Sequence, residues 1–82
     1  MKVYVFTRAY APEDGYLDIY ETKVFLSLDE AQAYMEKEID SCIHDPEDGD
    51  LWSIVYRTDF YCQMSYNRGR EQSTCCIEIH DI

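Results

Sequence analysis

The chain has 82 residues, and its 17 acids and 7 bases give it a formal net charge of −10. A chain of this length forms one domain, residues 1–82, and buries roughly 60% of the surface that it exposes when unfolded. Because like charges repel, this balance argues against direct binding to nucleic acid or to an anionic membrane and favours a basic protein partner.

Two strands are expected first along the chain. Lys2 to Arg8 carries apolar residues on both of its faces, which predicts a central strand. The proline, aspartate and glycine of Ala11 to Gly15 predict a turn. Tyr16 to Phe25 then predicts a second strand, with a bulge or bend where Glu21 to Lys23 interrupt its apolar pattern.

A single helix is expected in the middle of the chain. Ser27 is a good N-cap, because its hydroxyl can accept a hydrogen bond from the first turn, and Glu30 follows at the spacing of a capping box. From Leu28 onward, apolar residues recur every three or four positions, as on the buried side of a helix. The helix should stop near Ile43, because the His-Asp-Pro sequence that follows does not continue a helix well.

The stretch from Leu51 to Tyr66 predicts a long strand, because every second residue is apolar. We expect the helix to cover the side that carries Trp52, Ile54 and Tyr56. A second turn follows the strand, and the residues from Thr74 to His80 predict the last strand.

The predicted helix does not cover the far half of the long strand. A helix of about four turns is shorter than this strand, so the strand should either bend near Thr58 and Asp59 or project as a hairpin with the last strand. In both cases some apolar side chains of the far half are expected to be uncovered, and an uncovered aromatic patch would mark a partner or dimer contact. These side chains are Phe60, Met64 and Tyr66.

Together these elements predict an α+β fold, a single β-β-α-β-β domain. A helical connection usually returns the chain in its previous direction, so the third strand should run antiparallel to the first and pair with it. The predicted architecture is therefore a four-stranded antiparallel sheet with strand order 2-1-3-4 and one helix on one face.

The sequence also argues for a location and a redox state. No apolar run approaches the ~20 residues that span a bilayer. The first ten residues lack the pattern of a secretory signal, so we expect a cytoplasmic protein whose four cysteines are reduced thiols.

The sequence does not match a catalytic or metal-binding motif well. Zinc sites usually pair their ligands two to four residues apart, and here the spacings are irregular. The loop from Asp45 to Asp50 is acidic but does not align with an EF-hand. No glycine-rich element supplies an oxyanion hole or a phosphate loop, so we expect a protein that is not an enzyme and uses no cofactor. We also expect no metal, because buried apolar cysteines explain the four thiols more simply, and a minor metal-binding role stays as a third hypothesis. The candidate ligands weighed for zinc are Cys42, His44, Cys75, Cys76 and His80.

The acids of the helix and of the loop after it are the main functional signal. They are spaced at about one helical turn and then continue into the loop, so they can imitate the phosphates of a nucleic acid and bind a basic groove. The simpler interpretation is an ordinary solvated surface that promotes solubility. The proposed contacts to lysine and arginine of a partner are Asp29, Glu36, Asp40, Glu47, Asp48 and Asp50, with Tyr61 and Tyr66 as aromatic anchors.

A very short, strongly acidic, tyrosine-rich β-β-α-β-β chain resembles the small inhibitors that phages and mobile elements encode, such as anti-CRISPR proteins. Several of these act as DNA mimics. The resemblance covers size, charge and overall build, and no motif carries it. It implies an inhibitor of a basic, nucleic-acid-binding host-defence protein, such as a CRISPR effector, acting in the host cytoplasm.

A second hypothesis belongs to a different functional class. The chain would then be a small structural or regulatory domain that works through its sheet, either by forming a homodimer or by adding a strand at an open edge.

Overall fold

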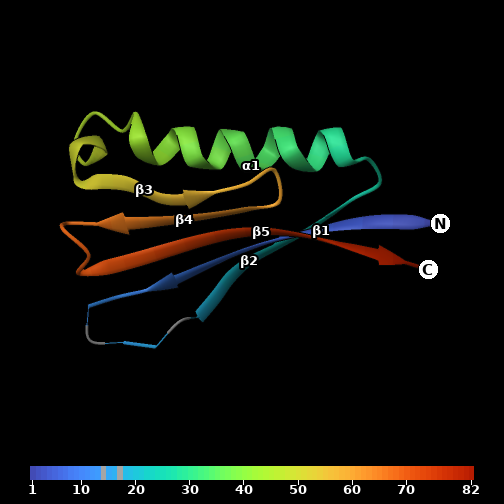
Figure 1. Ribbon diagram of the computed structural model, residues 1–82, viewed down its shortest axis with the longest axis horizontal. Coiled ribbons are helices and arrows are strands. Elements are labelled where there is room, and N and C mark those ends of the chain that lie inside the picture. The colour runs from blue at the N-terminus through green and yellow to red at the C-terminus, as the bar shows by residue number, and fades with distance from the viewer. Residues whose placement is uncertain (14, 17) are drawn as a thin grey trace.

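The computed structural model describes residues 1–13, 15–16 and 18–82. In this part of the chain a five-stranded sheet has the order β2-β1-β5-β4-β3, and every neighbouring pair is antiparallel (Figure 1). The elements are β1 Lys2–Ala11, β2 Asp18–Phe25, α1 Leu28–Ile43, the one-turn 3-10 helix η1 Gly49–Leu51, β3 Trp52–Arg57, β4 Tyr61–Tyr66 and β5 Glu71–Asp81.

The α+β class is as predicted, but the predicted count of four strands is wrong. The long predicted strand is split, because the chain reverses where the Thr58 N–H donates to the Tyr61 carbonyl at 2.7 Å. The bend predicted at Thr58 and Asp59 is therefore present as a full reversal. Its two arms, β3 and β4, pair as a hairpin.

The predicted strand order 2-1-3-4 is also wrong. The last strand, β5, pairs with β1 over ten positions, from Lys2 with Asp81 to Ala11 with Gln72. A strand of 11 residues offers β1 a longer ladder than the six residues of β3. β1 is central, as predicted, because β2 pairs along its other side.

The turn and bulge predicted near β2 are partly visible. The Gly15 N–H donates to the Pro12 carbonyl at 3.2 Å, which closes the predicted turn. The bulge lies one residue earlier than Glu21 to Lys23, because the pairing shifts between Glu21 and Ile19. Two residues of the predicted turn and strand, Asp14 and Leu17, lie outside the described residues.

The helix begins and ends as predicted. The Ser27 hydroxyl accepts the Glu30 N–H at 3.4 Å, and the His44 N–H donates to the Asp40 carbonyl at 3.0 Å. The buried residues of α1 recur every three or four positions, and they pack on one face of the sheet. They are Ala31, Met35, Ile39 and Cys42.

The reversal at the end of β3 changes which side chains the helix covers. Met64 is one of the three side chains of which some were expected to lack cover, and it is fully buried because β4 lies in the sheet beneath α1. Tyr56 was expected under the helix and is 58% exposed. A bulge at Val55 turns Tyr56 to the opposite face, where it pairs with Gln63. Trp52 packs against the core, as predicted.

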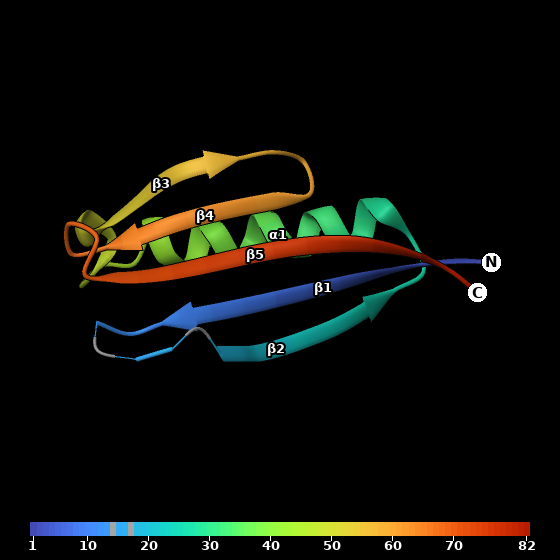
Figure 2. The ribbon, with the colours of Figure 1, turned by 60° about the horizontal axis from the view of Figure 1, so that its bottom comes forward.

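The second face of the sheet is open. In Figure 2, α1 lies behind β4 and β5, and none of the described helices crosses the face that is turned to the viewer. That face carries Val24, which is 62% exposed, and Tyr56.

Candidate protein-binding surface

The negative charge is concentrated in residues 28–51, which comprise α1, the following loop and η1 and are called the acidic segment below. Nine of the 17 acids and one of the seven bases belong to it, so it carries −8 of the formal charge of −10. The remaining 58 residues are close to neutral, with eight acids and six bases. A field of one sign therefore surrounds one helix and one loop.

The loop of the acidic segment is ordered by Asp45. Its Oδ1 atom accepts the N–H groups of Glu47 at 2.8 Å and Asp48 at 2.9 Å. The hydrogen bond from Asp48, followed by that from Glu47, lowers the pKa of the Asp45 carboxyl below its ordinary value. Asp45 thus holds the backbone and leaves Glu47 and Asp50 exposed to solvent.

Gly49 allows the loop to approach the helix closely. A Cβ atom at this position would lie 2.7 Å from the carbonyl oxygen of Ile43, which is backbone and cannot move aside easily. The glycine therefore lets the loop fold back against the end of α1, with its N–H bonded to the Asp45 carbonyl at 2.9 Å.

The structure brings four of the six proposed acidic contacts to one end of the helix. Asp40 is half-buried near the last turn of α1, and the exposed loop acids follow it. Asp29 is exposed in the first turn, roughly 16 Å along the helix axis from Asp40. The four that gather at the C-terminal end are Asp40, Glu47, Asp48 and Asp50.

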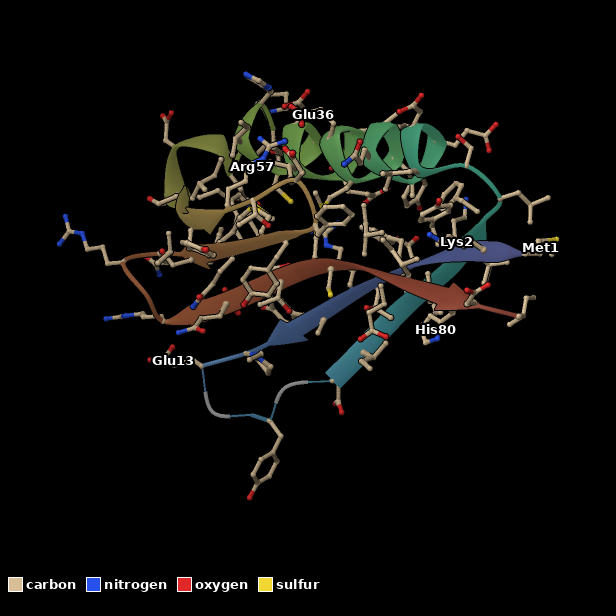
Figure 3. The ribbon with its side chains drawn as sticks, turned by 45° about the vertical axis from the view of Figure 1, so that its right-hand side comes forward. Met1, Lys2, Glu13, Glu36, Arg57 and His80 are labelled. Carbon is tan, nitrogen blue, oxygen red and sulfur yellow. The ribbon has the colours of Figure 1, made fainter. Side chains whose placement is uncertain are left out.

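Glu36 is exposed but already has a basic partner. Its Oε2 atom accepts a hydrogen bond from Nη2 of Arg57 in β3, and Figure 3 shows the two side chains side by side. The pair is partly exposed to solvent, so it reduces the local negative charge without removing it. Glu36 therefore contributes less to the field of the acidic segment than the loop acids do.

The two proposed aromatic anchors lie on opposite faces of the sheet. The Tyr66 hydroxyl donates to Oδ1 of Asp48 at 3.3 Å, and the Tyr66 ring lies 5.0 Å from that of Trp52. Burial and the nearby Asp48 carboxylate raise the pKa of Tyr66. Tyr61 faces the open side of the sheet, with its ring 6.1 Å from that of Tyr56. Tyr66 joins the acidic segment, and Tyr61 does not.

Sequence reasoning missed the role of Arg8. Its Nη1 atom donates to Oε2 of Glu38 at 2.8 Å, Nη2 donates to Sγ of Cys42 at 2.9 Å, and Nε donates to Oγ of Ser73 at 3.4 Å. These bonds tie α1 to β1 and β5. The available signal was a base on the apolar face of a central strand, in line with Tyr4 and Phe6.

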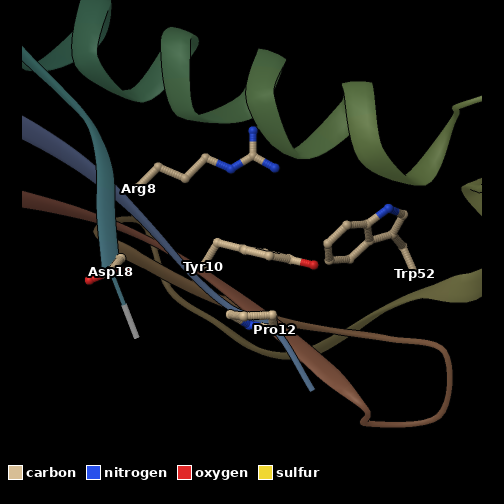
Figure 4. A pocket seen from close by; sticks show the side chains of 5 residues that line it. All are labelled: Arg8, Tyr10, Pro12, Asp18 and Trp52. Carbon is tan, nitrogen blue, oxygen red and sulfur yellow. The ribbon is translucent and has the colours of Figure 1, made fainter. Parts of the chain in front are cut away.

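Sequence reasoning also missed a pocket of about 500 Å³ beside the acidic segment. Among the described residues its walls are Arg8, Tyr10, Pro12, Asp18 and Trp52, as Figure 4 shows. Trp52 follows η1 directly in the chain, so the pocket borders the acidic loop. Its residues come from three strands and one turn, which no local sequence pattern connects.

The cysteines are free thiols, and three of them have a raised pKa. Burial raises the pKa of Cys62 and Cys76, and it raises that of Cys75 to about 12. A thiolate is the reactive form, so these three positions favour the unreactive thiol. Within the described ranges, no group of three His, Cys, Asp or Glu side chains is placed to hold a metal ion.

No family model, curated protein or solved structure matches this chain. None of the helices in the described ranges has the length and apolar character needed to cross a membrane.

Proposed function

We propose that this protein is a non-enzymatic binding protein whose acidic segment occupies the basic, nucleic-acid-binding groove of another protein. It would thereby keep nucleic acid out of that groove, as a DNA mimic does. The observation that supports this most directly is the concentration of −8 of the formal charge in residues 28–51. The small acidic inhibitors of the anti-CRISPR type provide the functional analogy, with a CRISPR effector as one class of target.

The ion pairs of the described residues are consistent with this proposal. Among the described residues, only two carboxylates of the acidic segment form an ion pair. Glu36 pairs with Arg57, and Glu38 pairs with Arg8. The other acids of the segment form no ion pair with a base of the described residues, and Asp45 orders the loop that carries several of them. Repulsion among these acids destabilises the helix end, since a negative charge there opposes the helix dipole. A basic groove would relieve that repulsion.

Charge reversal in the loop tests the proposal. The wild-type protein, immobilised and exposed to a bacterial lysate, should retain basic proteins that duplex DNA then displaces. Retention should weaken steeply between about 0.1 M and about 1 M salt, as the Debye length falls from roughly 10 Å to roughly 3 Å. The double variant Glu47→Lys/Asp50→Lys should lose at least about tenfold in affinity for the same proteins.

The matched control reverses two acids elsewhere. Asp59→Lys/Glu78→Lys changes the net charge equally, and both residues are exposed and lie outside the acidic segment. The control should retain the same proteins as the wild type. An equal loss in the control, or captured proteins that duplex DNA does not displace, would show that the acidic segment is not a DNA mimic.

A second candidate function rests on the open face of the sheet. Val24 and Tyr56 are more than half exposed there, and Tyr61 lies beside Tyr56. Strand addition at an edge is less favoured, because both edge strands carry a bulge and a base, Lys23 in β2 and Arg57 in β3. A homodimer through the open face is the form of the sheet hypothesis that the structure supports.

A further inference from the structure

The pocket beside the acidic segment has two aromatic walls, Tyr10 and Trp52, and one charged side chain of each sign, Arg8 and Asp18. Arg8 and Tyr10 come from β1, Asp18 from β2 and Trp52 from β3. In Figure 4, the Tyr10 side chain extends toward Trp52, and Arg8 points away toward α1. A volume of about 500 Å³ lies within the usual range of ligand pockets.

Both aromatic rings of the pocket are held by other residues. The Tyr10 hydroxyl donates to Oε1 of Glu71, and the Trp52 ring packs against Tyr66 at 5.0 Å. Held rings lose little freedom when a ligand stacks on them, and the face of a tryptophan or tyrosine ring attracts a cation. The aromatic part of the pocket therefore suits a flat cationic group.

The charges around the pocket favour a cation over an anion. Arg8 is already balanced by Glu38 at 2.8 Å, so its guanidinium adds little net positive charge. Asp18 lines the pocket and is exposed. Two further carboxylates lie one hydrogen bond away from its aromatic residues, Glu71 beyond Tyr10 and Asp48 beyond Tyr66. The surroundings thus carry a net negative charge.

We propose that this pocket binds the guanidinium group of an arginine side chain that the basic partner presents. The planar guanidinium stacks on Trp52, and the Asp18 carboxylate supplies the opposite charge. This inference rests on the proposed function, because it names the side chain by which a basic partner is anchored beside the acidic loop.

The protein contains one tryptophan, so its fluorescence reports directly on the pocket. N-acetyl-arginine methylamide should change the fluorescence of Trp52 saturably, with a Kd on the order of millimolar. The matching citrulline compound has nearly the same shape and no charge, and it should bind at least about tenfold more weakly. Equal affinity for the two compounds, or no saturable change with arginine, would overturn the proposal.

Two variants with the same change of charge separate the pocket from the general field. Asp18→Asn should weaken binding of the arginine compound at least about threefold. Asp59→Asn, in the turn between β3 and β4, should leave it unchanged. Equal effects of the two variants would show that the compound responds only to the net charge of the protein. Thermal unfolding of both variants confirms that each is folded.

The two proposals fail in different ways. If the wild-type protein captures basic proteins that duplex DNA displaces but shows no arginine binding at Trp52, the pocket proposal is wrong and the proposed function stands. If arginine binds at Trp52 with the predicted dependence on charge while the lysate yields no such proteins, the pocket is a guanidinium site and the DNA-mimic function is wrong.

Discussion

Arg8 of β1 and Glu38 of α1 form an ion pair in which Nη1 and Oε2 lie 2.8 Å apart, with their side chains only 11% and 20% exposed. The pair connects the helix that carries the acidic segment to the centre of the sheet. Because most of it is shielded from water, losing one partner leaves the other charge in a site that hydrates it poorly. The orientation of the acidic segment therefore depends on an internal salt bridge.

The substitution Arg8→Met should lower the free energy of unfolding by about 3 kcal/mol, because it leaves the Glu38 carboxylate unpaired. Urea unfolding measures this change. The double variant Arg8→Met/Glu38→Leu should recover most of the loss, since it removes both charges. Lys2→Met also replaces a base by methionine, but at an exposed position, and should alter the free energy of unfolding by less than about 0.5 kcal/mol. An Arg8→Met protein as stable as the wild type would contradict the prediction.

Asp45 should make stability depend on pH in the acid range. The N–H groups of Asp48 and Glu47 lower its pKa in the folded state, so its contribution is present above the unfolded pKa, near 4. That contribution is lost as the pH falls through the lower, folded-state pKa. Asp45→Ala should therefore have a lower Tm than the wild type near pH 7, and the difference should shrink progressively as the pH falls below about 4. Asp50→Ala, at an exposed neighbouring acid, should show no such trend. A pH-independent difference for Asp45→Ala would rule out the carboxylate as its cause.

The helix and its ends were predictable because their signals are local. Ser27, the apolar spacing of α1 and the residues after Ile43 act within a few positions of one another. The strand order was not predictable, because the partner of β1 is decided by a ladder between the two ends of the chain. The reversal at Thr58 contains no glycine, proline or asparagine that would signal a turn. The alternation of apolar and polar residues from Leu51 to Tyr66 therefore predicted one continuous strand.

The candidate site, too, was predictable only in the part that is continuous in sequence. The acidic segment is continuous in sequence, and the loop acids stay together in the fold. The pocket required the pairing of strands to bring Tyr10, Asp18 and Trp52 near one another. The separation of Tyr61 from Tyr66 follows from strand alternation, which places an odd and an even residue of one strand on opposite faces.

Tyr34 should make stability depend on pH in the alkaline range. Its hydroxyl donates to Oε2 of Glu21 at 2.8 Å, while Oε1 of Glu21 is buried and accepts no hydrogen bond from the described residues. Burial, and then the bond to Glu21, raises the pKa of Tyr34 above its ordinary value near 10. The folded state therefore holds the proton more tightly, so stability should fall as the pH rises above about 10. Tyr34→Phe should show a smaller fall, measured by urea unfolding across this range. Tyr16→Phe, at a side chain that is 91% exposed, should behave like the wild type. The same fall in all three proteins would exclude Tyr34 as its source.

The open face of the sheet predicts an association that does not depend on the acidic segment. Val24 and Tyr56 lie on this face, and burial of such apolar side chains against a second copy is favourable and nearly independent of salt. The wild-type protein should sediment as a dimer at both low and high salt. Tyr56→Asp should give a monomer, because a charge in the contact would lose its hydration. The same exchange at exposed Tyr16 should leave the dimer intact. A wild-type monomer at high protein concentration would exclude the dimer, and a dimer that dissociates only with rising salt would point instead to contacts between charged groups.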